Sequence, residues 1–225
     1  MKNSMLPYWL TLMVVLGVAY GGWHVWKNEQ AKQARIAASI RSTAAVETGP
    51  LSEFTLVERS GQPFRSQDMR GKVWVTSFFF TSCPNICLTM SNIFSSMQEI
   101  EELKDVYFVS ISCDPDNDTP EVLATYADRF NADPEHWLFC TGDFDYVKRV
   151  GEDFMKLTVL EKVHKEYAVI IDRAGKIRGR FNVIDANDRA EARDLLVECL
   201  AETAPQAAAS AGAEALARQV DPVVP

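Results

Sequence analysis

One stretch of this chain, from Val73 to Met97, constrains the fold more than any other. It opens with an apolar run, Val73 to Phe80, that is short and rich in β-branched and aromatic residues, as is typical of a strand buried on both faces. A turn with two cysteines, Cys83 and Cys87, follows, and apolar residues then recur at helical spacing up to Ile100. The stretch predicts a buried strand, a cysteine-bearing turn and an amphipathic helix, at the sheet edge where open α/β proteins place their functional groups.

The spacing of the two cysteines limits what the pair can do. Cys83 and Cys87 are four positions apart, so a C-x-x-C redox motif does not fit literally. We expect Pro84 in the first helical turn, where proline is favoured, which would place both cysteines on one helix face with Cβ atoms about 5–6 Å apart. That separation suits a disulfide, and it also lets two thiolates bind one metal ion. A helix N-terminus favours a thiolate at Cys83 in either case, and two buried structural cysteines are the remaining alternative.

Length, charge and cysteine count exclude several classes of protein. The chain has 225 residues, 47% hydrophobic, and a net charge of −8. Without its two ends, roughly 150 residues remain, enough for one domain with a sizeable core. The acidic balance and the lack of a basic stripe with aromatics argue against a nucleic-acid partner. Five is an odd number, so the cysteines cannot all pair within one chain. Five cysteines in 225 residues are also too few for a fold stabilised mainly by disulfides.

The N-terminal residues predict a membrane anchor. Residues 5–26 are nearly uncharged and mostly apolar, and about 20 such residues span a bilayer core. Aromatic residues mark both ends of this segment, as in an interfacial belt: Tyr8, Trp9, Trp23 and Trp26. A cleaved signal peptide is the alternative, but its apolar region is usually about 7–15 residues long. We therefore expect a retained transmembrane helix.

The division of the chain follows from these signals. We predict an anchor at 1–26, a spacer at 27–50, a folded domain at 51–203 and a disordered tail at 204–225, which is rich in Ala and Pro. The flanking charges conflict with an external domain, because Lys27, Lys32 and Arg35 follow the anchor and only Lys2 and the terminal amine precede it. Taken alone, the positive-inside rule would place the domain in the cytoplasm.

The rest of the domain alternates strands and helices. Further strands are predicted at Phe54 to Val57, Val106 to Ser112, Trp137 to Thr141, Tyr167 to Ile171 and Ile177 to Val183. Helices are predicted at Val122 to Phe130, Asp143 to Phe154 and Asp188 to Glu202. This order predicts an α/β domain with a mostly parallel centre. A cysteine-bearing helix after a strand, with a closing β-hairpin and helix, is the thioredoxin-like arrangement.

An acidic loop and three histidines are further metal-ligand candidates. Asp114, Asp116 and Asp118 have the spacing of calcium ligands, but Thr119 replaces the required glycine. We therefore interpret the loop as a helix cap, with Thr119 as N-cap and Pro120 as the first helical residue.

Of the three histidines, His24 lies in the predicted anchor, and His136 is interpreted as an ordinary, partly exposed side chain. His164 precedes a strand that we expect beside the cysteine strand, where it can approach Cys83 and Cys87.

Several motifs together resemble the Sco/SenC family of membrane-anchored, thioredoxin-fold copper proteins. The matching segments are Phe80 to Cys87 (FTSCPNIC), Ser112 to Glu121 (SCDPDNDTPE), Trp137 to Gly142 (WLFCTG) and His164 with the later turn glycine Gly175. The resemblance covers about Glu53 to Ala201. It implies that Cys83, Cys87 and His164 bind copper, and that the protein helps to assemble the copper centre of cytochrome c oxidase.

The chain departs from the family pattern at a few positions. Leu88 follows the second cysteine, where the family often has proline, and Cys113 and Cys140 replace the more usual Val or Leu. We expect Cys113 and Cys140 to be buried in place of those apolar residues. Cys199 lies on the apolar face of the last helix and is expected in the core.

The chemistry of the three ligands agrees with the resemblance. Two thiolates and an imidazole suit copper, as Cu(I) or Cu(II), whereas a structural zinc site normally has four ligands. The resemblance implies partners in the copper-bearing oxidase subunit or another copper chaperone. It also implies a single-pass protein of the inner membrane with its domain in the periplasm or an equivalent space, against the charge count.

A thiol–disulfide oxidoreductase is the alternative function, because it would use Cys83 and Cys87 without His164. Such reductases normally have a proline just before the strand that faces the cysteines, where this chain has Lys165-Glu166-Tyr167. This difference favours copper binding. A peroxidase of the same fold is a weaker alternative, because no resolving-cysteine arrangement is evident.

Overall fold

The computed structural model describes residues 13–28, 52–160 and 166–202, which belong to two compact units, Met1–Glu47 and Thr48–Pro225. In the first unit, residues 13–28 form a helix whose large apolar side chains are exposed. Across the described segments, no helix is both long enough and apolar enough to cross a membrane. Residues 5–12 of the predicted anchor, most of the predicted spacer and the predicted tail lie outside the described residues.

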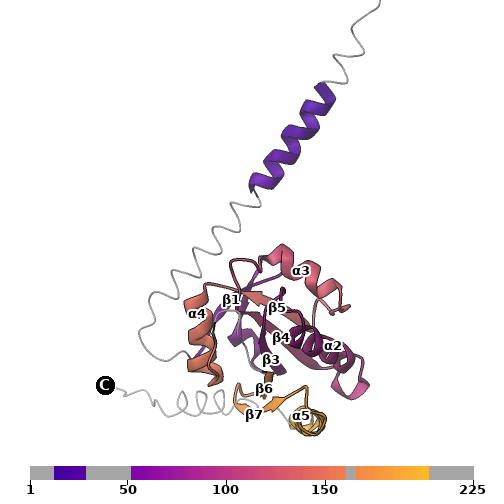
Figure 1. Cartoon of the computed structure of the whole chain (residues 1–225), viewed down its shortest axis with the longest axis vertical. Coiled ribbons are helices and arrows are strands. Elements are labelled where there is room, and N and C mark those ends of the chain that lie inside the picture. The colour runs from indigo at the N-terminus through magenta and orange to yellow at the C-terminus, as the bar shows by residue number, and fades with distance from the viewer. Residues whose placement is uncertain (1–12, 29–51, 161–165, 203–225) are drawn as a thin grey trace, which may run out of the picture. The chain divides into compact units, whose positions relative to one another are not determined.

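The second unit is built on one seven-stranded sheet of order β2-β1-β5-β4-β3-β6-β7 (Figure 1). Its strands are β1 (Thr55–Glu58), β2 (Pro63–Arg65), β3 (Val73–Phe79), β4 (Val106–Ser112), β5 (Trp137–Thr141), β6 (Tyr167–Ile171) and β7 (Ile177–Asn182). The central strands β3, β4 and β5 are parallel, and the outer strands pair antiparallel. The predicted α/β domain with a parallel centre is confirmed.

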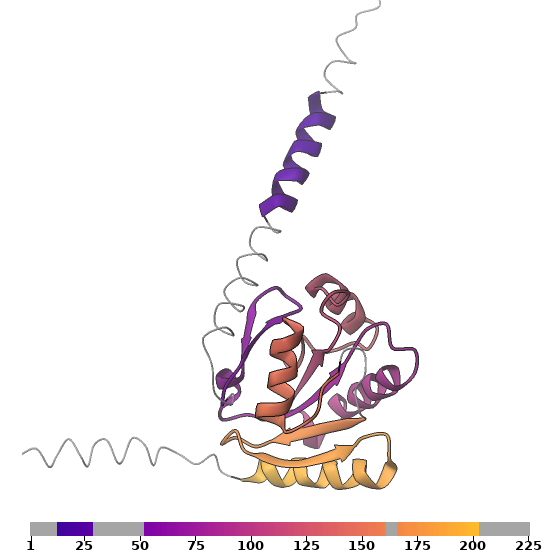
Figure 2. The same cartoon turned by 60° about the vertical axis from the view of Figure 1, so that its left-hand side comes forward.

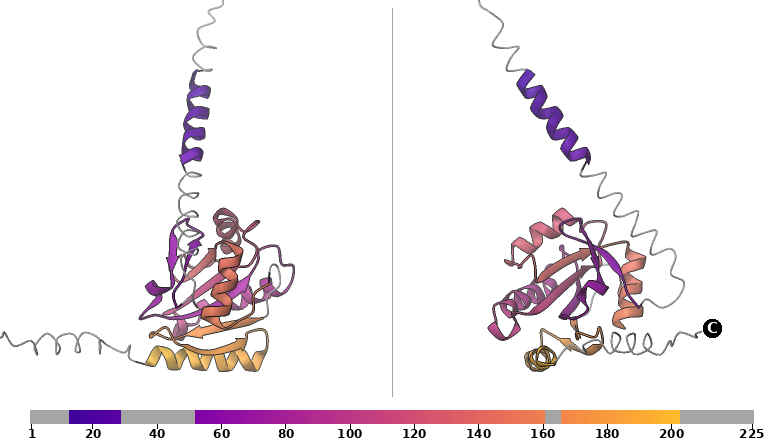
Figure 3. Two further views of the ribbon diagram at one scale, coloured as in Figure 1. Left: turned by 90° about the vertical axis from the view of Figure 1, so that its left-hand side faces the viewer. Right: turned by 180° about the vertical axis from the view of Figure 1, so that it is seen from behind.

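Helices cover both faces of this sheet. They are α2 (Ile86–Gln98), α3 (Pro120–Asp128), α4 (Phe144–Arg149) and α5 (Ala186–Ala201), with short 3-10 turns η1 (Ser66–Met69) and η2 (Glu101–Leu103). Side chains of α2, α3 and α5 share one apolar core with the central strands. Helix α4 lies across the sheet from α2 and α3 (Figure 3), and α5 runs along the β6–β7 hairpin (Figure 2).

Strand β3 lies in the interior of the sheet, between β4 and β6, and all seven of its residues are buried. It pairs in parallel with β4, with Phe79 opposite Ser112 at the carboxyl end. It also pairs antiparallel with β6, with Ser77 opposite Ala168. The ends of β3 and β4 and the start of β6 therefore meet at one edge of the sheet, where the cysteine turn lies.

Two predicted helix boundaries are wrong. Helix α2 begins at Ile86, so Pro84 lies in the preceding turn and not in the first helical turn. Asn85, the residue after Pro84, is the N-cap and has a non-helical φ of −132°, so helical geometry cannot begin before it. The predicted helix Asp143 to Phe154 is α4 only to Arg149, and the chain continues as a π-helix, Val150–Met155.

The π-helix brings two segments of backbone into close contact at Gly151. A Cβ atom there would lie 2.2 Å from Cγ2 of Val159, 3.1 Å from the carbonyl oxygen of Leu157 and 3.2 Å from Cζ of Phe78. The chain reverses at Lys156, which has a φ of +56°, and Leu157 N–H donates to the Gly151 carbonyl at 2.8 Å. Gly151 thus packs residues 157–159 against the carboxyl-terminal part of β3.

Replacing Gly151 by alanine should destabilise the domain. The added methyl group must displace backbone as well as side chains, and overpacking of this kind costs about 1–3 kcal/mol. Urea unfolding followed by circular dichroism measures the loss. Gly21→Ala is the control, because a Cβ at Gly21 meets nothing within 4 Å. Equal unfolding midpoints for Gly151→Ala and the wild type would contradict this packing.

Candidate metal centre

The turn between β3 and α2 brings Cys83 and Cys87 together. Cys83 is partly exposed in the turn, and its N–H donates to the Phe80 carbonyl at 3.2 Å. Cys87 is fully buried in the first turn of α2, and its sulfur accepts from the Phe80 N–H at 3.5 Å. The Cys87 thiol hydrogen-bonds to the Cys83 sulfur. The two sulfurs are therefore adjacent, as the spacing predicted, although only Cys87 is helical.

The two thiols are electrostatically unequal. Burial acts to raise the pKa of Cys83, but hydrogen bonds from the N–H groups of Cys87, Asn85 and Ile86 and from the Cys87 thiol lower it below the usual thiol value. Burial raises the pKa of Cys87 well above that value, and the neighbouring Cys83 sulfur raises it further. Cys83 is thus the more acidic and more accessible of the two thiols.

This inequality predicts the order of alkylation in the reduced, metal-free protein. Iodoacetamide should label Cys83 before Cys87, because it reacts with exposed thiolate. The labelling rate of Cys83 should rise with pH earlier than that of an ordinary cysteine, since its lowered pKa lets the thiolate form at lower pH. Peptide mass spectrometry after short exposures measures both rates. Equal labelling of the two residues, or earlier labelling of Cys87, would contradict the assignment.

A buried carboxylate connects the cysteine turn to the acidic loop. Asp118 is fully buried and accepts hydrogen bonds from the Thr81 N–H at 3.1 Å and from the hydroxyls of Thr81 and Ser112, both at 2.5 Å. Asp114 is also buried and accepts from the Asn117 side-chain amide at 2.9 Å. These bonds hold Thr81, two residues before Cys83, against the end of β4. The sequence analysis missed this role of Asp118, for which the only signal was its place after a buried strand.

Two further buried side chains lie near the sulfurs. The hydroxyl of Tyr126 in α3 hydrogen-bonds with that of Ser91 at 3.1 Å. Burial raises the pKa of Tyr126 to about 12, with smaller contributions from the charges of Cys87 and Cys83. The Cys113 thiol donates to the Phe79 carbonyl at 3.3 Å. Cys113, Cys140 and Cys199 are all buried, as predicted.

The predicted third ligand, His164, lies outside the described residues. Within the described segments, no group of three or more His, Cys, Asp or Glu side chains is arranged to hold a metal ion. The cysteine pair is thus the part of the predicted ligand set whose geometry is defined. Strand β6 begins at Tyr167, three residues after position 164, at the sheet edge that carries the pair.

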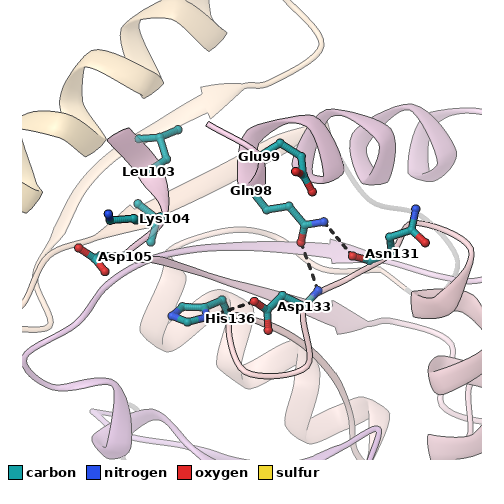
Figure 4. A pocket seen from close by; sticks show the side chains of 9 residues that line it. Gln98, Glu99, Leu103, Lys104, Asp105, Asn131, Asp133 and His136 are labelled. Atoms are coloured by element: carbon teal, nitrogen blue, oxygen red, sulfur yellow. Dashed lines mark hydrogen bonds and ion pairs between the residues drawn. The ribbon is translucent and has the colours of Figure 1, made fainter. Parts of the chain in front are cut away.

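The other two histidines are away from the cysteine turn in the sequence and make local contacts. In the helix at 13–28, His24 hydrogen-bonds with the Tyr20 hydroxyl at 3.0 Å. His136 is half-buried, with its Nδ1 atom 3.4 Å from an Asp133 carboxylate oxygen, which supports its interpretation as an ordinary histidine. It borders a cavity of about 610 Å³ between the C-terminal end of α2 and the start of β4 (Figure 4).

Comparison with known proteins identifies the family. The sequence profile described as SCO1/SenC matches residues 43–196. The chain belongs to the SCO1/SenC family. A SCO2-like protein of Rickettsia typhi is 31% identical over 140 residues, which cover 57% of this chain and 68% of that protein.

Solved SCO1/SenC structures have the same fold. A SCO1/SenC family lipoprotein from Bacillus anthracis is 30% identical, with a TM-score of 0.61 over 68% of this chain and 95% of its own. Yeast Sco1 with copper bound is 24% identical, with a TM-score of 0.56 over 70% and 90% of the two chains. BsSco, a member of the Sco family of cytochrome c oxidase assembly proteins, is 23% identical, with a TM-score of 0.58 over 68% and 95%. The predicted thioredoxin-like fold is confirmed.

Proposed function

We propose that this SCO1/SenC protein binds copper through Cys83, Cys87 and His164 and delivers it to the copper centre of cytochrome c oxidase. The observation that carries the proposal is the adjacency of the two sulfurs at the edge of the sheet, one partly exposed and one buried. Yeast Sco1 has been solved with copper bound, and BsSco belongs to a family of oxidase assembly proteins. Both facts support the same role for the present chain, which belongs to the same family.

The cysteine pair has the chemistry that copper binding requires. Thiolates are soft ligands that select Cu(I), and they must lose their protons when the metal binds. Three backbone N–H groups favour loss of the Cys83 proton, whereas burial opposes loss of the Cys87 proton. The Phe80 N–H then remains as a hydrogen-bond donor to the Cys87 sulfur. The backbone therefore holds both sulfurs in place for the metal.

The reach of the chain allows His164 to complete the ligand set. Tyr167 begins β6 at the edge that carries the cysteines, and three residues of chain span at most about 11 Å. On the other side, Gly151 fixes residues 157–159 near Phe78 of β3. Residues 157–159 and Tyr167, on either side of the segment with His164, both lie by the carboxyl end of β3, and this supports His164 as the third ligand. A three-ligand site leaves copper a free position through which a recipient can take it.

A transfer experiment tests the proposed function. The purified reduced protein is loaded with Cu(I). It is then mixed with the cytochrome c oxidase domain that normally holds the copper centre, from the same organism and prepared without copper. We expect copper to appear on the recipient at a rate that depends on the recipient's concentration, as followed by separation and metal analysis. Copper retained by the donor after prolonged mixing, or release at the rate of free dissociation, would contradict delivery.

Thiol–disulfide exchange is the second candidate, and the inequality of the two thiols favours it specifically. The Cys83 thiolate would attack a target disulfide, form a mixed disulfide and release one target sulfur as a thiolate. The Cys87 thiolate would then attack the Cys83 sulfur of the mixed disulfide and release the second target sulfur as a thiolate, so that the pair becomes a disulfide and the target gains two electrons. This reaction needs no histidine. A variant at His164 therefore separates the two candidates.

We also propose that residues 5–26 anchor the protein in the inner membrane, with the domain in the periplasm or an equivalent space. The exposed apolar side chains of the helix at 13–28 support this proposal, and a relative from Bacillus anthracis is a lipoprotein. Protease added to spheroplasts should digest the domain while a cytoplasmic marker survives. Full protection of the domain would mean that the charges at Lys27, Lys32 and Arg35 set the orientation.

A further inference from the structure

A groove of about 370 Å³ lies beside the cysteine turn, on the side of α3. It is lined by one residue of the turn and five residues from α3 and its end: Thr81, Glu121, Val122, Thr125, Tyr126 and Arg129. The groove is therefore continuous with the segment that carries Cys83. A molecule seated in it would contact Thr81, two residues before Cys83.

The walls of this groove are held rigidly. Thr81 is fixed by its two hydrogen bonds to the buried Asp118 carboxylate. Tyr126 is buried, and its hydroxyl is held by Ser91. A preformed surface loses little entropy when a partner binds, which favours its use as a docking site.

The groove combines an exposed apolar side chain, Val122, with one acidic and one basic side chain, Glu121 and Arg129. Val122 is 38% exposed, although it is a large apolar residue in a folded domain. The Arg129 guanidinium lies 5.7 Å from the ring centroid of Tyr126 and 5.9 Å from that of Phe130. Within the described segments, no carboxylate forms an ion pair with Arg129. The chain is acidic overall, with a net charge of −8, yet Arg129 has no carboxylate partner in these segments. Its guanidinium can therefore form an ion pair with a carboxylate of another molecule.

We propose that this groove docks the protein that exchanges copper with the cysteine pair, through a partner segment in which an apolar side chain lies beside a carboxylate. The proposal rests on the proposed function, because it assigns a partner to the same site. The apolar side chain would cover Val122, and the carboxylate would pair with Arg129. Arginine and aromatic side chains are enriched among the residues that dominate binding energy at interfaces, which fits the Arg129–Tyr126 pair.

The test compares two valines of equal exposure. Val122→Asp removes the apolar contact and puts a charged side chain where the partner's apolar side chain would lie, and an acid is tolerated in the first turn of α3. Val197→Asp is the matched control, since Val197 is 39% exposed but lies on α5, outside the groove. Arg129→Gln tests the ion pair separately. Circular dichroism verifies folding of each full-length variant.

Docking is measured without and with copper, using the copper-bearing domain of the same organism's oxidase as the probe. In copper-free calorimetric titrations, Val122→Asp and Arg129→Gln should weaken binding of the probe at least ten-fold, and Val197→Asp should not. In copper transfer, the same two variants should need correspondingly more probe for half-maximal rate, with copper stoichiometry unchanged.

Wild-type affinity in both groove variants would overturn the docking proposal while leaving the proposed function intact. A wild-type protein that binds the probe through the groove but takes up no copper would instead overturn the proposed function. Self-association in ultracentrifugation that Val122→Asp abolishes, without loss of probe binding, would assign the groove to a second copy of this chain and overturn the partner named here.

Discussion

Replacing Cys83 by serine, or Cys87 by serine, should abolish tight copper binding by the reduced protein. A serine hydroxyl is a hard ligand that keeps its proton at neutral pH, so it cannot replace a thiolate toward Cu(I). Competition with a Cu(I) chelator of known affinity measures the loss for each variant and for the double variant. We expect the apparent affinity to fall by several orders of magnitude.

Cys199→Ser is the matched control for this experiment. Cys199 is buried in α5, where its charged neighbours are Arg178, Glu198 and Glu202, and its replacement removes a thiol that is not part of the turn. It should keep the copper affinity of the wild type even if its unfolding midpoint falls. A double Cys83/Cys87 serine variant with wild-type copper stoichiometry and affinity would place the site elsewhere.

Replacing His164 by alanine should weaken copper binding by orders of magnitude and impair oxidase assembly, while changing the Cys83–Cys87 reduction potential far less. An imidazole contributes a metal ligand, whereas disulfide exchange needs only an attacking thiolate and an accessible target sulfur. The shift in potential should be on the order of tens of millivolts, where about 30 mV corresponds to 1.4 kcal/mol. Copper titration and redox equilibration with glutathione are done on the same variant.

His136→Ala is the control for the histidine experiment. His136 contacts Asp133 beside a different cavity, so its loss should leave both copper affinity and reduction potential unchanged. The contrary result is that His164→Ala binds copper normally and supports oxidase assembly, while the cysteine variants fail. Thiol–disulfide exchange would then explain the site better than copper delivery.

The elements whose signals are local could be predicted from the sequence. The buried β3, the hairpin turn at Gly175 and the start of α3 with Thr119 as N-cap all follow from short runs of residues, and each is found. The start of α2 could not be predicted in this way. Pro84 is a local signal for a first helical turn, but Asn85 after it has a non-helical φ of −132°, which no local pattern indicates.

The proximity of Cys83 and Cys87 followed from their spacing, but their unequal acidity did not. That inequality depends on which sulfur is buried and on which backbone N–H groups face each one. Asp118 accepts hydrogen bonds from Thr81 and Ser112, which lie 37 and 6 residues away in the sequence, so no local pattern predicts them together. His164 was a ligand candidate from its place before a strand expected beside the cysteine strand, and the family resemblance then assigned it to the ligand set.

The most direct test of the central claim is the copper content of the purified protein in its reduced and oxidised states. Copper that binds to Cys83 and Cys87 requires both sulfurs as thiolates, and a disulfide between them removes both ligands. After incubation with copper and removal of the unbound metal, we predict one copper ion per chain in the reduced protein and essentially none in the oxidised protein. Equal copper in the two states would contradict binding by this pair.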